Sequence, residues 1–488
     1  MEILVNLIAI VVVVLLFNFM IFIHELGHFL AAKWRGLAVD KFYIWFGKPI
    51  WKKTIGGVEY GIGSIPAGGY VALPQMAPME SIEGGDSTRR KELPPITPLD
   101  KIIVAFAGPL FSFGLAFAAA CLVWVVGKPR GTVDTTVVGY VQAGSPADQA
   151  GIQVGDEIVS VDGKEVDKFF GGLSGFSERV MLSENKTVRV GVKRGEQELT
   201  LTSGFLSKEN SWWQRKAMRE IGVSYASDMD VIFVQEESPA DRAGLKVGDR
   251  VLSISGIAVK SHLHLGDILK ENLGKTLPMT IKRGEEELVL QVDSVIPIDK
   301  VTKEPQPDGQ PKIGAGFSSP VDQSLVKPNP FVQVKESVEL MVSTIQAIVA
   351  KDSNVGIQHL SGPIGIGGAM FDFIRSDYAI QLILWFMVVL NINLAIMNLL
   401  PFPVLDGGHI VFAIGEWIRG RPVKLRILEV VQTGFVVVLL SLFVYITTKD
   451  IGDRFFGGGD QWGAGGWAWP ELASTSEPAT PLEPAPVP

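Results

Sequence analysis

The sequence predicts a polytopic α-helical membrane protein with four transmembrane helices, a membrane-associated β-hairpin region and two tandem α+β domains. Four stretches lack charged side chains over about the 20 residues that a membrane-spanning helix needs. One segment of the chain recurs in its middle. The 488 residues are 47% hydrophobic yet 20% charged, with a mean hydropathy of +0.28, which fits membrane segments joined to water-exposed domains.

The four apolar stretches are residues 3–23, 102–127, 378–405 and 430–448. The first one follows Glu2 where a signal peptide would carry basic residues, and no small-residue cleavage site follows it. We therefore interpret it as a retained membrane helix.

Charge predicts how these helices are oriented. Lys and Arg gather between residues 33 and 101 and between residues 419 and 426, and such segments face the cytoplasm. The N-terminus, residues 128–377 and the C-terminus are then extracytoplasmic, which for the inner (cytoplasmic) membrane of a bacterium means periplasmic. The net charge of −8, with no basic block, argues against a nucleic-acid partner.

The middle of the chain contains a duplication. SPADQAGIQVGDEIVSVDG at 145–163 aligns without a gap with SPADRAGLKVGDRVLSISG at 238–256, and similar strands follow at 192–201 and 281–290. Each copy predicts a short helix ended by Gly151 or Gly244, a Gly-Asp turn and an alternating strand.

These repeats resemble PDZ domains, which bind extended peptide ends by adding a strand to a sheet edge. The resemblance implies peptide capture or size gating; the alternative is a spacer. Residues 221–225 and 313–317 are expected to supply the carboxylate-loop end of each copy.

The segment HELGH, residues 24–28, predicts a metal site. On a helix, His24 and His28 project from one face, and Glu25 lies about 100° round from His24. In such HExxH sites zinc lowers the pKa of its water to about 7 and the glutamate takes the proton. The alternative is a pair of buried histidines satisfied by helix neighbours. Since Cys121 is the single cysteine, nitrogen and oxygen ligands must hold any metal.

Two histidines leave a tetrahedral zinc short of one protein ligand and one water. Another His, Asp or Glu at membrane depth should supply the ligand, and Asp406 is the only carboxylate between Asp377 and Glu416. Pro401 and Pro403 break the helix there, and irregular backbone at membrane depth is tolerated where protein buries it or it lines a cavity.

Together with Asn398, Pro401 and Leu405-Asp406-Gly407, HELGH resembles the site-2 protease family of intramembrane zinc metalloproteases, peptidase family M50. The repeats make the chain most similar to the sigma-E-regulating bacterial members with two PDZ domains. The resemblance, which reaches about residue 455, implies zinc held by His24, His28 and Asp406, with Glu25 activating water. It implies cleavage within the lipid bilayer of single-pass substrates such as anti-sigma factors or remnant signal peptides.

The same resemblance implies a membrane-reentrant β element, matched by residues 56–73. Tyr60, Ile62 and Ser64 alternate, and Pro66, Gly68 and Gly69 predict the turn of a hairpin. An exposed strand edge could hold an unwound substrate by backbone pairing. The alternative is a hairpin that only packs.

Family likeness also assigns a substrate-binding role to the broken segment. Asn398 is expected to hydrogen-bond the substrate backbone, and Pro401 and Pro403 to shape that wall; Asn393 is the weaker candidate. Ser112 departs from the family, because asparagine usually occupies its place, so we leave it out of the catalytic set.

The remaining histidines have lesser expected roles. His409 could orient a ligand, His359 is expected to be structural, and His262 and His264 are expected on a surface strand or loop. Two other hypotheses are a non-catalytic PDZ tether with structural zinc and a metal transporter. One tight polar cluster, instead of a chain of polar residues along the helices, disfavours the transporter.

The expected domain boundaries follow from these features. The tail, with tryptophans at 462, 467 and 469, is expected to be disordered and either a linker or in contact with the membrane interface. The regions are 1–36 (helix 1 with HExxH), 37–100 (β region), 101–128 (helix 2), 129–226 and 227–320 (PDZ domains), 321–377 (amphipathic linker), 378–410 (helix 3 with LDG), 411–455 (helix 4) and 456–488 (tail).

Overall fold

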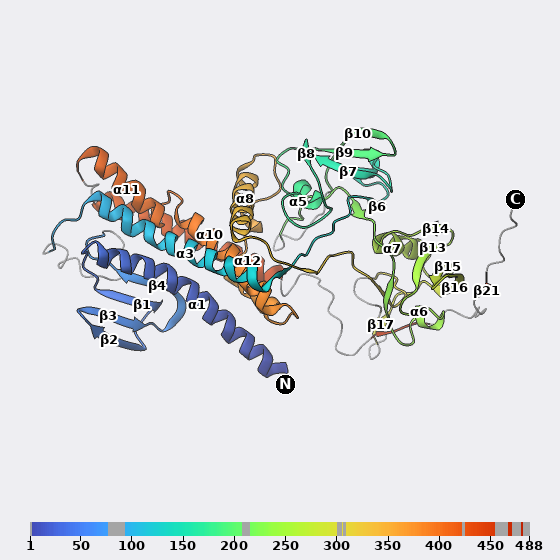
Figure 1. Ribbon diagram of the computed structural model, residues 1–488, viewed down its shortest axis with the longest axis horizontal. Coiled ribbons are helices and arrows are strands. Elements are labelled where there is room, and N and C mark those ends of the chain that lie inside the picture. Colours follow the sequence, from blue (N-terminus) through green and yellow to red (C-terminus); the bar gives the residue numbers. More distant parts are fainter. Residues whose placement is uncertain are drawn as a thin grey trace.

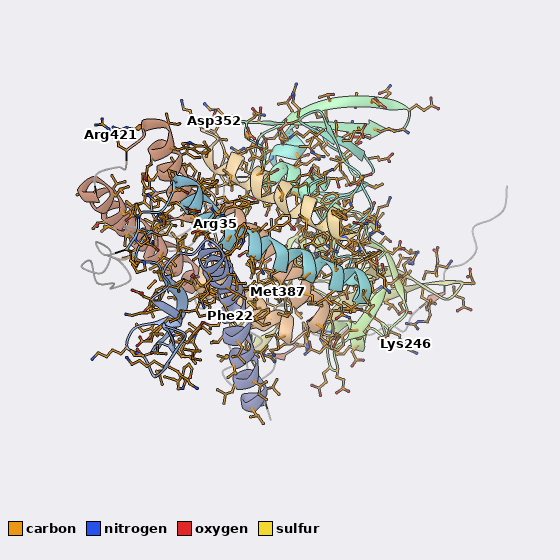
Figure 2. All side chains as sticks on the ribbon, turned by 60° about the vertical axis from the view of Figure 1, so that its left-hand side comes forward. Phe22, Arg35, Lys246, Asp352, Met387 and Arg421 are labelled. Atoms are coloured by element: carbon orange, nitrogen blue, oxygen red, sulfur yellow. The ribbon has the colours of Figure 1, made fainter. Side chains whose placement is uncertain are left out.

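A computed structural model describes residues 2–76, 93–206, 215–299, 305, 309–421, 425–453, 467–470 and 480–481. Helices and a small sheet form one end of the elongated molecule in Figure 1, and two β-rich domains follow toward the other end. In Figure 2, Phe22 and Met387 lie within the helices, and Lys246 lies far from them in the second β-rich domain.

Four helices are long and apolar enough to cross a membrane, as predicted: α1 (Glu2–Trp34), α3 (Pro98–Val126), α10 (Ala379–Asn398) and α12 (Leu425–Ile451). A capping box between Thr97 and Asp100 starts α3. Buried Ala116 and Ala120 of α3 pack with Met20 of α1 and Ile392 of α10. Small side chains let these backbones approach closely, which is how helices associate in lipid.

Outside the two repeats, the other described helices are α8 (Pro330–Val349), the 3₁₀ helix η2 (Ile357–His359), α9 (Pro363–Ile374) and α11 (Asp406–Arg419). The LDG motif therefore does not belong to the third spanning helix, as the boundary 378–410 supposed. The helix α10 ends at Asn398, and Asp406 begins α11. The two prolines between them account for the break.

A four-stranded sheet follows α1, with strand order β2-β3-β1-β4. Its strands are β1 (Lys41–Phe46), β2 (Trp51–Ile55), β3 (Val58–Ile62) and β4 (Ile65–Ala72). The strands β2 and β3 form the hairpin, with Gly56 and Gly57 at positive φ in its turn. The strand β1 runs parallel to β3 and antiparallel to β4.

The expected hairpin across residues 56–73 is therefore wrong. Tyr60 and Ile62 lie in the interior strand β3, and Ser64 lies between β3 and β4. Gly68 and Gly69 lie within β4, at the sheet edge, instead of in a turn. Alternation identifies strands but not their partners, and β1 is inserted between the two strands that were expected to pair.

The apolar side chains of this sheet and its loops fall into a buried set and an exposed set. Phe42, Val58 and Val71 are buried against Phe29 of α1 and Val104 of α3. A second apolar set is exposed: Phe46, Ile50, Trp51, Ile55 and Ile65. An exposed apolar surface of this kind marks contact with a membrane or a partner.

The two repeats have the same order of elements. The first contains β6 (Val138–Val141), α4 (Pro146–Gln149), β7 (Glu157–Val161), β8 (Lys164–Glu165), α5 (Phe176–Met181), β9 (Val188–Arg194), β10 (Gln197–Ser203) and β11 (Val223–Tyr225). The second contains β12 (Val231–Val234), α6 (Pro239–Arg242), β13 (Arg250–Ile254), β14 (Ile257–Ala258), α7 (His262–Glu271), β15 (Thr276–Arg283), β16 (Glu286–Asp293) and β18 (Ala315–Phe317).

The order of the strands within the sheets is also the same in the two repeats. The order β10-β9-β7-β8 corresponds to β16-β15-β13-β14, and the pair β11–β6 corresponds to β18–β12. Each domain has its own buried core. Short pairs join β5 (Lys128–Pro129) to β19 (Leu325–Val326), β17 (Ile298–Asp299) to β20 (Trp467–Ala468), and β21 (Thr480–Pro481) to β16.

The first repeat domain is fastened to the helices by two arginines. Arg215 contacts Asp450 at the end of α12, and Asp450 also accepts hydrogen bonds from the backbone N–H groups of Gly362 (3.0 Å) and Gly365 (2.8 Å) beside α9. Buried Arg219 donates to the Ser183 carbonyl at 2.6 Å and to the carbonyl of Asp352. The Arg215–Asp450 and Arg219–Asp352 contacts join the domain to the end of α12 and to the segment after α8.

The Gly-Asp turn of each repeat holds a buried ion pair. Asp156 and Asp249 are each 1% exposed, and each accepts a hydrogen bond of 2.7 Å from the Nε of Arg194 or Arg283. The repeated sequence thus fixes the same cross-strand contact twice.

We expect Asp156→Asn to speed backbone hydrogen exchange in β7 and β9 by more than about tenfold, because it removes charge-assisted hydrogen bonds. Burial raises the pKa of Asp156, but hydrogen bonds from Arg194 and the Gln153 backbone outweigh it and hold that pKa below its usual range. This stabilisation is therefore present above about pH 4 and lost as the pH falls through the lowered value. Exchange measured by mass spectrometry at two pH values, with exposed Asp167→Asn as control, checks both statements; equal rates in both variants would contradict them.

Candidate metal centre

Three buried side chains converge from two distant parts of the chain. The Nε2 atom of His24 lies 3.3 Å from Asp406 Oδ2, and the Nε2 atom of His28 lies 3.4 Å from Asp406 Oδ1. The two Nε2 atoms are 3.3 Å apart. No other group of His, Cys, Asp or Glu with metal-binding spacing occurs in the described part of the chain.

This spacing fits zinc. Zinc bonds of about 2.0–2.2 Å in a tetrahedron put the ligand atoms about 3.3–3.5 Å apart. The set is all nitrogen and oxygen, and three protein ligands leave the fourth position for water or substrate, as in catalytic zinc sites. The donor set and its geometry therefore suit a catalytic zinc better than a closed structural one.

The outer ring nitrogens of both histidines have partners on α3. His28 Nδ1 donates to the Val104 carbonyl at 2.8 Å, and His24 Nδ1 lies 3.0 Å from Ser112 Oγ. Such partners fix the ring orientation and turn Nε2 toward a metal. Ser112 was not expected in the site; its place three residues after Pro109 on the facing helix is the signal that could have predicted it.

Glycine at position 108 keeps the metal position open. A Cβ atom there would lie 2.2 Å from His28 Nε2 and 2.9 Å from His24 Nε2. Gly27 likewise lets α1 approach α3, because a Cβ atom at Gly27 would lie 2.4 Å from the Ala107 carbonyl oxygen. The missing side chains of Gly27 and Gly108 therefore allow both the close packing of α1 on α3 and the open metal position.

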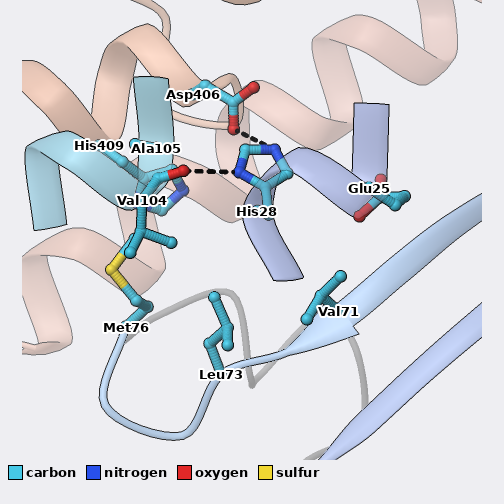
Figure 3. Close-up of a pocket in the computed structure, with 9 residues that line it drawn as sticks. All are labelled: Glu25, His28, Val71, Leu73, Met76, Val104, Ala105, Asp406 and His409. Carbon is cyan, nitrogen blue, oxygen red and sulfur yellow. Dashed lines mark hydrogen bonds and ion pairs between the residues drawn. The ribbon is translucent and has the colours of Figure 1, made fainter. Parts of the chain in front are cut away.

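A small pocket adjoins this cluster (Figure 3). Glu25, His28, Asp406 and His409 supply its polar side chains, and the rest of its lining is apolar: Val71, Leu73, Met76, Val104 and Ala105. The edge strand β4 passes beside Glu25, since a Cβ atom at Gly69 would lie 3.3 Å from Glu25 Cγ. Val71 of β4 and Glu25 thus border the same pocket.

Two glycines after Asp406 allow the broken segment to fold onto α11. A Cβ atom at Gly407 would lie 2.2 Å from the Leu399 carbonyl oxygen, and one at Gly408 would lie 2.1 Å from that of Phe402. The helix α12 supports the segment, because Gln432 donates to the Pro403 carbonyl at 3.0 Å. These contacts explain how Asp406 is presented at a helix start.

The other predicted residues lie outside the pocket lining. Asn398 ends α10, and Pro401 and Pro403 lie in the segment between α10 and Asp406. Tyr60, Ile62 and Ser64 do not reach the pocket either.

The structure also shows where the remaining histidines lie. His409 is buried and lines the pocket, and its Nε2 has no hydrogen-bond partner within the described ranges. His264 stacks on Tyr140, and His359 binds the Gly356 N–H group and the Lys216 carbonyl, which is a structural role. Both His262 and His264 lie on α7 instead of a strand or loop.

Four helices apolar enough to span a membrane, together with an HExxH motif, an aspartate and an open ligand position, define a membrane-embedded metallopeptidase. Comparison with known sequences agrees: residues 12–442 match the model of peptidase family M50. The chain belongs to this family, and it is an intramembrane zinc metalloprotease.

Three relatives illustrate the similarity. The chain is 29% identical to Protease RseP of Yersinia pestis over 430 residues, which cover 84% of this chain and 90% of that protein. It is also 29% identical to the regulator of sigma-E protease RseP of Escherichia coli over 432 residues, with the same two coverages. A relative from Vibrio cholerae whose name describes a zinc metalloprotease is 29% identical over 458 residues, which cover 88% of this chain and 94% of that protein.

Proposed function

We propose that His24, His28 and Asp406 hold the zinc ion and that Glu25 is the general base for peptide hydrolysis. The observation that carries this proposal is the spacing of the three ligand atoms, with Glu25 lining the same pocket. Bound zinc polarises the scissile carbonyl and lowers the pKa of water. Glu25 accepts the proton of the attacking water and delivers it to the leaving amine.

The edge strand β4 positions the substrate. Peptide bonds within a helix are shielded, so a substrate must unwind, and an unwound segment can pair with an exposed strand edge. Among the described strands, only β1 pairs with β4. We therefore assign the pairing role to the Gly68–Gly69 region of β4 instead of to Tyr60 and Ile62. Asn398, Pro401 and Pro403 form the more distant wall.

The protein acts in a bacterial inner membrane, with the two repeats on the periplasmic side as PDZ domains that gate access. Its substrates are single-pass membrane proteins, of which anti-sigma factors and signal-peptide remnants are the candidates. Support comes from the relatives named for sigma-E regulation and from the shared order of elements in the repeats.

A cleavage assay in liposomes tests this function. Purified protein, a panel of single-helix substrates and mass spectrometry of the products would show scission inside the membrane segment that stops on zinc removal and returns with zinc. Full zinc occupancy without cleavage of any substrate would favour the tether with structural zinc instead.

We expect Ser112→Ala to weaken zinc binding by about 10- to 100-fold, because the His24 ring loses the partner that orients it. Competition with a zinc chelator measures the change. Ser441→Ala is the matched control, since the Ser441 hydroxyl donates only to its own helix, at the Val437 carbonyl. Equal zinc affinity in the two variants would exclude a positioning role for Ser112.

A further inference from the structure

The C-terminal tail makes a specific contact with the second repeat domain. Most of the expected disordered tail, including Trp462, lies outside the described residues, but 467–470 are described and lie on this domain. The strand β20 pairs antiparallel with β17, in the register Ile298↔Ala468 and Asp299↔Trp467. For Trp469 the described contacts are with this domain, while the linker and membrane-interface interpretations of the tail stay predictions.

Side chains reinforce this pairing at the loop that we expected to receive peptide ends. A Cβ atom at Gly314 would lie 3.0 Å from Trp469 Cζ2, so the indole ring packs directly on this loop. Arg242 Nη2 donates to the Pro470 carbonyl at 3.3 Å. The indole Nε1 is buried and has no hydrogen-bond partner among the described residues, so the ring contributes by packing alone.

The first repeat lacks the corresponding cation. The alignment places Gln149 opposite Arg242, and both side chains donate to the carbonyl at the start of their turn, Gly144 at 3.0 Å and Glu237 at 2.8 Å. Only arginine has a second N–H group directed to the tail. The docking chemistry is therefore particular to the second repeat.

We propose that the second repeat domain holds the Trp-Ala-Trp-Pro segment, residues 467–470, as an intramolecular ligand beside Gly314. The surface fits an extended, tryptophan-bearing strand whose carbonyl accepts from arginine. Tethering gives such a ligand a high effective concentration, about millimolar for flexible linkers. In the resting protein, peptides that would enter by this loop must displace the tail; this consequence rests on the proposed peptide-binding role, whereas the docking does not.

Disulfide trapping in the full chain tests the docking without any cleavage assay. Ile298→Cys and Ala468→Cys are introduced together, with Cys121→Ala so that they are the only two cysteines. Direct cross-strand neighbours lie about 4.5–5.5 Å apart at Cα, within reach of a disulfide. We expect rapid cross-linking under mild oxidation, and about tenfold less when Arg242→Gln and Trp469→Ala are added.

Two controls make the result specific. Trp469→Phe keeps an aromatic ring at this position and should keep the cross-link, because the indole Nε1 makes no hydrogen bond with the described residues that could be lost. Ala258→Cys paired with Ala468→Cys places the first cysteine in β14, at an edge of the five-stranded sheet that contains neither β17 nor β20, and should not cross-link. Equal yields for both cysteine pairs, or no effect of the Arg242 and Trp469 substitutions, would overturn the proposal and leave the proposed protease function untouched.

Discussion

Glu25→Gln should leave zinc bound and reduce cleavage by about 10²–10⁴-fold, the range that a general base contributes. The amide has nearly the same size as the carboxylate but cannot accept a proton from water. The three proposed metal ligands are other side chains, so metal content should stay at one ion per chain. Metal analysis and a cleavage time course on the same preparation measure both quantities.

The control is Glu339→Gln, an exposed carboxylate on α8 whose contact is a surface ion pair with Lys335. It should cleave at the wild-type rate. If Glu25→Gln cleaved as fast as this control, another group would have to be the base, and His409, which lines the same pocket, would be the first to test.

Much of the site could be predicted from the sequence because several of its side chains are close neighbours in the chain. The i, i+4 spacing of His24 and His28 fixes a shared helix face. Asp406 could be paired with them although it lies far along the chain, because it is the only carboxylate between Asp377 and Glu416. The structure places these three residues together as expected.

Contacts between residues that are distant in the chain were harder to predict from the sequence. The alternation around Tyr60 identified strands, but the insertion of β1 between β3 and β4 depends on packing against Phe29 and Val104, which no local pattern encodes. The role of Ser112 was missed for the same reason. Its hydroxyl meets His24 only once α1 and α3 pack at the distance that Gly27 and Gly108 permit.

The short distance between α1 and α3 also makes zinc binding sensitive to any side chain added at position 108. Gly108→Ala should abolish zinc binding, with occupancy reduced more than about tenfold and cleavage reduced with it. The added methyl group would lie 2.2 Å from His28 Nε2 and 2.5 Å from its Cε1, far inside van der Waals contact. The His28 ring must then rotate away, so its Nδ1 bond to Val104 and its approach to Asp406 cannot both persist.

Gly114→Ala separates this effect from helix propensity, because it lies on the same helix and a Cβ atom there meets nothing within 4 Å. Both substitutions favour helix formation by up to about 1 kcal/mol, so neither should unfold α3 on that account. We expect full zinc occupancy in Gly114→Ala and near-zero occupancy in Gly108→Ala, at similar thermal unfolding temperatures of the metal-free proteins. Normal zinc binding by Gly108→Ala would mean that α1 and α3 lie farther apart than the convergence of His24, His28 and Asp406 requires. In that case the metal would need a different ligand set.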